Sequence, residues 1–373
     1  MIEIVEVKTK KQQKLFVNFQ IKLYKKCKYF VPPFIKEEMG LFDPKINPNY
    51  DDCEMVFYLA YKNGAVAGRI GGILQRISNK KTNQKYVRFT RIDFINDIEV
   101  VKALFKAVED WAREKGQEYV HGPLGFNDLE REGLLVEGFD RMATYEENYS
   151  YDYYPKLIEE VGYKKDVDWL QYFVNVPSEL DKRIVRMSNV LERRYNIKYV
   201  QAKNINDLVN RYKDKIFSLL DDGYDELYGS VPITEKQKEQ LVSQFKMIVD
   251  TDFIALVENE KSELVGFALA LPNIAKAVQK MKGRYLSIHI FSLLKQIKNP
   301  KIIDTALISV RSDYRAKGVA SLLIGKIMGN TINRGIKYIE ALHQLENNVA
   351  IRNLHEGYDK EQHKRRRCYI KKL

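Results

Sequence analysis

One order of strands and helices can be read twice along this chain, and this repetition restricts the possible folds more than any other feature. In the first half, residues 55–60 and 66–74 form two strand-like runs joined at Asn63-Gly64, a dipeptide typical of hairpin turns. An amphipathic helix over 97–112 follows, and then a further strand. The second half repeats this order, which predicts two copies of one α/β fold, each with a mixed sheet flanked by helices.

The second copy begins with strand-like residues 253–257 and 264–271 and ends with a strand over 338–345 and another helix. Near Pro177 the chain passes from a strand-like run to a charged helix, so we place the boundary there. The expected domains are residues 1–177 and 178–373. A length of 373 residues agrees with two to three domains at roughly 150 residues each.

The segment from residue 305 to residue 335 predicts a strand, a short polar loop and a helix that ends at Gly335. Arg315, Gly318 and Ala320 stand where the loop passes into the helix. The open backbone N–H groups and the positive dipole end of such a helix bind phosphate, and a glycine lets a pyrophosphate approach the backbone closely. The segment therefore predicts a site for a phosphorylated cofactor.

The spacing Arg-x-x-Gly-x-Ala, five residues after Val310, resembles the acyl-CoA-binding motif of the GNAT (GCN5-related N-acetyltransferase) superfamily. Downstream, Asn347, Ala350 and Gly357-Tyr358 resemble the Asn-x-x-Ala and Gly-Phe stretch of the same superfamily. The resemblance implies that acetyl-CoA or a longer acyl-CoA is bound as co-substrate. It assigns cofactor binding to ten residues: Ile308, Val310, Arg315, Ala316, Lys317, Gly318, Val319, Ala320, Asn347 and Asn353.

The first half has no such motif, because DFINDIEVVKAL occupies the corresponding position. Its expected role is support or acceptor binding, a division of labour known from tandem GNAT proteins such as the peptidoglycan-bridge aminoacyltransferases. Residues 28–38, 42–48 and 122–140 look like a family of bacterial GNAT-like proteins of this length, some of which N-acylate sphingoid bases. That resemblance implies a small-molecule or lipid amine as acceptor. The polar loop over 127–132 is either simply solvated or part of an acceptor-binding loop.

Acyl transfer from a thioester to an amine needs a neutral amine, a polarised carbonyl and a protonated leaving thiolate. His343 and Glu346 are the candidates for the general base, with Glu340 behind them, and Asn347 is a further candidate catalytic residue. Each of these side chains can equally be solvated or bonded to its neighbours. Strand alternation predicts that His343 lies on the face opposite Glu340 and Glu346.

In most members of the superfamily a tyrosine on the following helix is the general acid, and the position that aligns with it here is Leu354. Asn353 or His355 can serve in its place, or the acid is absent. Two interpretations therefore stay open. One is an acyl-CoA-dependent N-acyltransferase, and the other is a non-catalytic GNAT-fold protein that binds acyl-CoA as a sensor or scaffold.

The net charge of +12 favours acidic partners, among them anionic lipid, an acidic acyl carrier and the phosphates of coenzyme A. The insertion over 272–301 is cationic and amphipathic, as suits an interfacial helix, a lid over an acyl chain, or a helix packed on the sheet. We expect a cytoplasmic protein that can sit at the inner membrane face. The basic end of the chain lies where the fold needs its last strand, which disfavours nucleic acid.

Three widely separated cysteines indicate neither a disulfide framework nor a zinc site, so we expect no metal. Nothing in the sequence indicates an oligomeric state.

Overall fold

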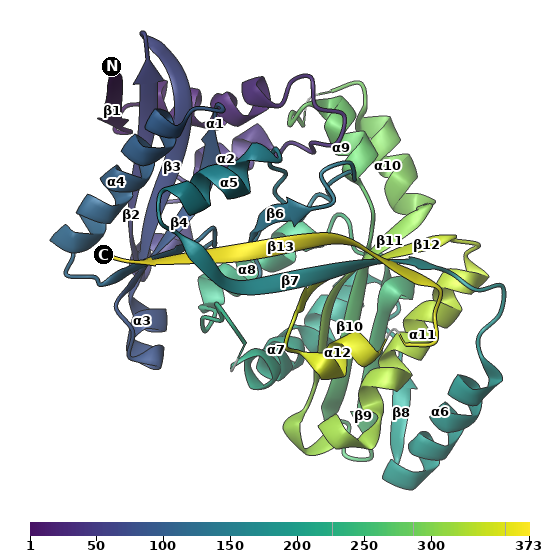
Figure 1. The fold of residues 1–373 in the computed structure, drawn as a ribbon. Coiled ribbons are helices and arrows are strands. Elements are labelled where there is room, and N and C mark those ends of the chain that lie inside the picture. Colours follow the sequence, from purple (N-terminus) through teal and green to yellow (C-terminus); the bar gives the residue numbers. More distant parts are fainter. Residues whose placement is uncertain (226, 286, 355) are drawn as a thin grey trace. The chain divides into compact units, whose positions relative to one another are not determined.

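The computed structural model describes the whole chain except three residues, Glu226, Leu286 and His355. The chain divides into two compact units, which are described separately here. The first unit comprises Met1–Trp169, Ala275–Ile290 and His363–Leu373, and the second comprises Leu170–Ile274 and Phe291–Gln362. Each unit has a mixed sheet flanked by helices, as the repeated order of elements predicts (Figure 1).

In the first unit the sheet order is β1-β2-β3-β4-β5-β13, with β6 also paired to β13. The strands are β1 (Ile2–Glu6), β2 (Cys53–Lys62), β3 (Ala65–Gln75), β4 (Tyr86–Phe94), β5 (Tyr119–Gly122), β6 (Leu134–Glu137) and the last part of β13 (Lys360–Lys372). The helices are α1 (Lys10–Leu23), α2 (Ile35–Gly40), α3 (Arg76–Thr82), α4 (Ile98–Glu114), α5 (Tyr153–Glu160) and α9 (Ala275–Met281), with a 3-10 turn at Pro48–Asp51. Only β4 and β5 pair in parallel among the register pairs of this unit.

The predicted hairpin is present, since Asn63 and Gly64 both have positive φ, 52° and 76°, as its two-residue turn needs. Helix α4 covers one face of the sheet with fully buried apolar side chains, and two glycines of β3 make room for it. A Cβ on Gly68 would lie 2.7 Å from Leu104 of α4. On the other face, Phe16 of α1 packs edge-on against Phe57.

In the second unit the order is β7-β12-β11-β10-β9-β8. The strands are the last part of β7 (Lys164–Asn175), β8 (Ile197–Val200), β9 (Ile254–Asn259), β10 (Leu264–Pro272), β11 (Ile302–Val310) and β12 (Tyr338–Leu345). The helices are α6 (Lys182–Tyr195), α7 (Ile205–Tyr224), α8 (Glu235–Phe245), α10 (Ile290–Lys298), α11 (Val319–Asn333) and α12 (Val349–Asn353), with 3-10 turns η2 (Thr251–Phe253) and η3 (Ser312–Lys317).

The sheet of the second unit has a separate apolar cluster on each face. One cluster joins Ile303 and Ile339 of the sheet to Leu322 and Leu323 of α11, with Leu191 of α6 packed against it. The other joins alternate sheet residues to α7 and α8, for example Phe267 to Leu220. Period-2 alternation along buried strands explains how one sheet supplies both clusters. Helix α11 thus lies on one face and α7 on the other (Figure 1).

The insertion over 272–301 forms two helices rather than one. Helix α9 is anchored in the first unit, where the Gln279 amide donates to the carbonyls of Lys28 (3.0 Å) and Phe30 (2.8 Å). In the second unit α10 buries Leu293, whereas Phe291 and Leu294 are 77% and 55% exposed. None of the helices formed by the described residues is long and apolar enough to cross a bilayer.

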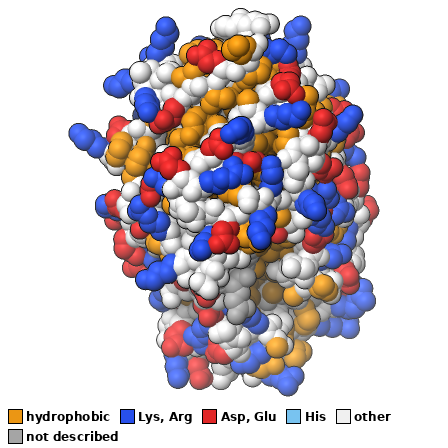
Figure 2. All heavy atoms as spheres, turned by 60° about the vertical axis from the view of Figure 1, so that its left-hand side comes forward, with side chains coloured by type: hydrophobic (Ala, Val, Ile, Leu, Met, Phe, Trp, Pro, Cys, Tyr) orange, Lys and Arg blue, Asp and Glu red, His pale blue; other side chains and the backbone are white. Residues whose placement is uncertain are grey.

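Lysine and arginine side chains are spread over the face shown in Figure 2, with acidic side chains between them. On that face the net charge of +12 is therefore not collected into one basic patch.

Candidate functional site

Strands β11 and β12 pair in parallel only as far as Thr305 and Ala341, and then separate. A register shift in the pairing of β11 with β10, between Leu269 and Ala270, lies directly beside the point of separation. His343 adds a positive φ of 28° on β12, which bends that strand. The result is a fork in the second unit, the β11/β12 fork, in which no strand of the described residues pairs with residues 306–310 on one edge.

The open edge of β11 leads directly into the predicted anion loop. The 3-10 turn η3 follows the strand, and Gly318 then takes φ 77° and ψ 9° before α11 begins at Val319. Most other residue types tolerate this left-handed conformation poorly. Among the described residues no side chain caps the first turn of α11, so its N–H groups can meet a phosphate.

The basic residues of the loop hold it in shape. Arg315 donates to the carbonyls of Val310 (3.3 Å) and Asp222 (2.7 Å), which ties the loop to β11 and to α7. The ammonium of Lys317 lies 4.2 Å from the ring centre of Tyr314. Arg315 and Ala316 are exposed, whereas Val319 is fully buried beneath the loop.

The residues predicted around the thioester occupy both strands of the fork. Ile308 and Val310 lie on the open edge of β11, and His343 lies on β12 two residues beyond the last pair. Glu346 and Asn347 follow the end of β12, with Glu346 partly buried and Asn347 exposed.

Asn353 ends α12 and is exposed, and Leu354, at the position of the usual acid, follows it and is partly buried. Their neighbour His355 lies outside the described residues.

Two buried carboxylates, Asp304 and Glu340, lie at the base of the fork. The sequence pointed to Glu340 but not to Asp304. Asp304 and Glu340 are opposite one another in the β11–β12 register, one pair before the strands separate. Each is only 4% exposed, and Asp304 accepts a hydrogen bond of 2.8 Å from Asn273. Residues in register on parallel strands point to the same face, so the two carboxylates lie side by side. Either can take a proton from an amine, directly or through water.

The end of α7 is the second feature that sequence reasoning missed. The Asp222 carboxylate accepts from the Ser312 N–H of the loop at 2.9 Å. The Tyr224 phenol oxygen lies 3.4 Å from the nitrogen and 3.3 Å from the carbonyl oxygen of Ile308. Both side chains come from a helix that precedes β11 by about eighty residues, and no local pattern marks them.

The first unit has a fork of the same kind, but its own chain fills it. Strands β4 and β5 pair as far as Arg88 and His121, and β4 then continues to Phe94 paired with β3 but no longer with β5. Leu124 then donates its N–H to the carbonyl of Phe89 at 3.0 Å, on the edge of β4 that β5 has left. The Arg88 guanidinium holds this segment by donating to the carbonyls of residues 125 and 126.

The helix that follows β4 also differs from α11. Asp97 caps α4 by accepting from the N–H of Glu99 at 3.0 Å, and its carboxylate pairs with Lys62. A carboxylate already occupies the place of an anion. Both observations agree with the missing cofactor motif in this half.

The polar loop over 127–132 is less solvated than a charged loop usually is. Asn127 is 8% and Glu132 5% exposed, and the Arg131 guanidinium donates to the carbonyl of Tyr145 at 2.6 Å. Burial raises the pKa of the Glu132 carboxyl well above its usual value. The interpretation of this loop as simply solvated is therefore wrong for these residues.

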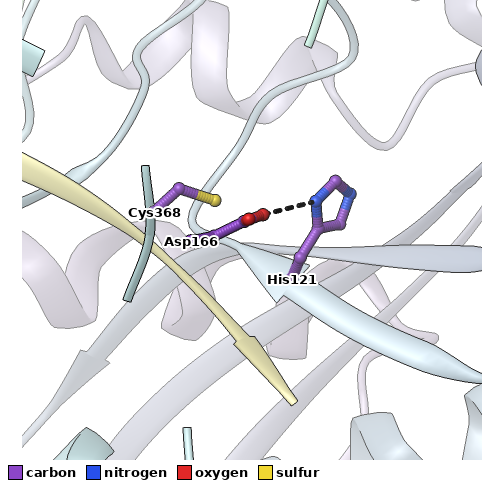
Figure 3. A group of neighbouring side chains, drawn as sticks. All are labelled: His121, Asp166 and Cys368. Atoms are coloured by element: carbon purple, nitrogen blue, oxygen red, sulfur yellow. Dashed lines mark ion pairs between the residues drawn. The ribbon is translucent and has the colours of Figure 1, made fainter. Parts of the chain in front are cut away.

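His121, Asp166 and Cys368 lie together in the first unit, with one donor atom of each within 4.8 Å of the others (Figure 3). Burial, together with the Arg88 charge, lowers the pKa of His121 to about 3. The imidazole is neutral at physiological pH, so its contact with Asp166 at 4.0 Å is not a charged pair. Imidazole, thiol and carboxylate suit zinc, but a guanidinium in register beside the imidazole opposes a divalent cation, and we assign no ion here.

A scan against models of known protein families gave no match. Two curated proteins align over nearly the full length at 26% identity. Protein YghO of Escherichia coli covers 98% of this chain and 94% of its own length. The bacterial ceramide synthase of Caulobacter vibrioides covers 100% of this chain and 98% of its own length.

Solved structures with the same fold include two that align over nearly the whole chain. A tandem GNAT protein from the clavulanic acid biosynthesis pathway covers 100% of this chain and 98% of its own, with a TM-score of 0.54 and 10% identity. A GCN5-related N-acetyltransferase from Sphaerobacter thermophilus covers 99% and 95%, with a TM-score of 0.50 and 11% identity. The chain therefore has the tandem GNAT fold that its sequence resemblance predicts.

Proposed function

We propose that this chain is an acyl-CoA-dependent N-acyltransferase, which moves an acetyl or longer acyl group from coenzyme A to a primary amine. The observation that carries the proposal is the β11/β12 fork, which opens at Thr305 and runs into the uncapped N-terminus of α11 at Gly318. The fork supplies a strand edge that β12 has left, on which the Tyr224 phenol meets Ile308, for the amide-bearing arm of coenzyme A. The helix terminus supplies N–H groups for its pyrophosphate.

The residues at the base of the fork can perform the amine chemistry. The attacking amine must lose a proton, and Asp304 and Glu340 are two carboxylates within one register pair of the opening. His343 and Glu346 remain alternatives for the general base. His343 belongs to β12, which forms the other side of the fork, and Glu346 follows the end of that strand. The N–H of Ile308 can polarise the thioester carbonyl.

A lipid amine is the acceptor that we favour. A relative aligned over 98% of its own length is named a bacterial ceramide synthase. Helix α10 exposes Phe291 and Leu294 and carries Lys295 and Lys298 in its last turn, a composition that suits contact with an anionic membrane surface. Co-sedimentation with phosphatidylglycerol vesicles tests this, because Leu294→Ser should weaken binding whereas an unchanged bound fraction would contradict the contact.

The second candidate function is a sensor or scaffold that binds acyl-CoA without turnover. The observation that favours it is Leu354, which stands where a tyrosine is usual and cannot donate a proton.

Coenzyme A release, followed with a thiol reagent, separates the two functions. The assay uses acetyl-CoA and palmitoyl-CoA against dodecylamine, sphinganine, spermidine and a lysine-containing peptide. Amine-dependent release supports the enzyme. Thermal stabilisation by acyl-CoA without release for any amine supports the sensor. If acyl-CoA gives no stabilisation and no coenzyme A is released, both functions are contradicted.

A further inference from the structure

The end of α7 is fixed to β11 next to the fork by three contacts within the second unit. The Ser309 hydroxyl donates to the carbonyl of Leu219 at 2.7 Å. The Ser312 N–H donates to Asp222 at 2.9 Å. Gly223 lies so close that a Cβ there would be 2.1 Å from Ser309 Oγ. The backbone at the end of α7 therefore cannot move away from β11 without breaking these contacts.

This attachment places the phenol of Tyr224 on the open edge of the strand. Its oxygen accepts from the Ile308 N–H at 3.4 Å and donates to the Ile308 carbonyl at 3.3 Å. These two groups point away from β10, which pairs with the other edge of β11. They are the groups that a thioester or amide of the coenzyme arm would meet first in the fork. A bound carbonyl would take over the N–H, and the phenol would stay beside it because its backbone is held.

Thioester aminolysis needs a proton donor for the departing sulfur near Ile308. The amine nitrogen forms a bond to the acyl carbon, the C–S bond breaks, and the electron pair leaves on sulfur. The proton lost by nitrogen passes to a carboxylate, and the sulfur gains one from a separate donor. A phenol and an alkyl thiol have ordinary pKa values of about 10 and 8.5, close enough for the phenol to serve. Leu354 offers no such proton.

We propose that Tyr224 is the general acid that protonates the departing coenzyme A thiolate. This acid comes from α7, whereas the usual tyrosine comes from the helix after β12, which is α12 here. The assignment rests on the proposed N-acyltransferase function. It also explains how a leucine can stand at position 354 of an active enzyme. After each turnover the phenolate recovers its proton from the carboxylate that received one from the amine, through water, so the cycle needs no further reactant.

The test compares Tyr224→Phe with the wild type and with Tyr212→Phe, using acetyl-CoA or palmitoyl-CoA and the amine that works best. Tyr212 is a matched control, because it lies on the same helix with its hydroxyl bonded to Arg211 and takes no part in the fork. We expect kcat of Tyr224→Phe to fall about 100-fold with little change in KM. Thermal stabilisation by the acyl-CoA should persist. Tyr212→Phe should keep its activity.

A second measurement detects proton donation itself. With a fluorinated tyrosine at position 224, whose phenol is more acidic, the alkaline limb of the kcat profile should move to lower pH. The assignment is overturned if Tyr224→Phe stays within threefold of wild-type kcat, if its loss lies entirely in KM, or if the alkaline limb does not move. If the wild type itself releases no coenzyme A, the proposed function fails first and this assignment with it.

Discussion

Two glycines of α11 offer a matched pair of substitutions that separates ligand binding from backbone strain. Gly318 opens the helix with φ 77°, and Gly335 follows its end with φ 66°. Alanine in the left-handed region costs about 1–2 kcal/mol at either position. At Gly318 the new Cβ also meets a side-chain carbon of Leu191 at 3.0 Å, whereas nothing lies within 4 Å at Gly335. Both variants should therefore lose stability without ligand, and Gly318→Ala should lose more of it than Gly335→Ala.

Their response to acyl-CoA should differ. A ligand at 100 times its dissociation constant stabilises the fold by about 2.7 kcal/mol, and a 100-fold loss of affinity reduces this to about 0.4 kcal/mol. Because a Cβ at position 318 strains the turn whose N–H groups are proposed to bind the pyrophosphate, we expect a loss of this size for Gly318→Ala and none for Gly335→Ala.

Urea unfolding with and without one fixed concentration of acetyl-CoA or palmitoyl-CoA measures the difference. If Gly318→Ala keeps the full stabilisation, or if Gly335→Ala loses it equally, the assignment of the phosphate site is refuted.

Three further predictions concern single side chains. Asp304→Asn should lower kcat by about 100-fold if this carboxylate takes the proton of the amine, and acyl-CoA binding should not change. Arg69→Met should destabilise the fold by about 3–5 kcal/mol in urea unfolding, because it leaves the Asp93 carboxylate, 2.7 Å from the Arg69 guanidinium, buried without its counter-charge; a loss below about 1 kcal/mol would contradict this. The pKa of His121 is about 3 in the fold, below the usual 6.5, so the unfolded chain binds the extra proton. Stability should therefore fall as pH drops from about 6.5 towards 3, by up to about 1.4 kcal/mol per pH unit for this group, and His121→Gln should have a shallower slope than the wild type in urea unfolding between about pH 6.5 and 4.5.

The sequence predicted the elements that depend on local patterns. The helix over Val319–Asn333 and the strand over Tyr338–Leu345 follow from apolar periodicity and flanking glycines, and both are confirmed. The hairpin at Asn63-Gly64 follows from the dipeptide alone. Gly318 lies before the first residue of α11, as its local sequence predicted, and its role in binding a cofactor stays a prediction.

Contacts that join distant parts of the chain were not predictable in this way. Tyr224 meets Ile308 across 84 positions, and nothing in the residues around Tyr224 indicates a partner. The segment after β5 was not predictable for the same reason, because it meets β4 through the hydrogen bond from Leu124 to Phe89, which are 35 positions apart. Asp304 was overlooked because a single carboxylate within an apolar strand becomes informative only when Glu340 is known to lie beside it.

Hydrogen exchange of the full-length protein with and without acyl-CoA tests the central claim most directly, because it reports where the ligand covers backbone N–H groups. The account predicts slower exchange on binding at residues 306–310, the open edge of β11, and at residues 316–320 of the loop. Residues 89–94 of β4 should be unchanged, since Leu124 already bonds to the Phe89 carbonyl and the Tyr154 phenol already accepts from the Phe94 N–H. Protection of β4 in place of β11, or no protection at either fork despite binding, would contradict the assignment of the acyl-CoA site.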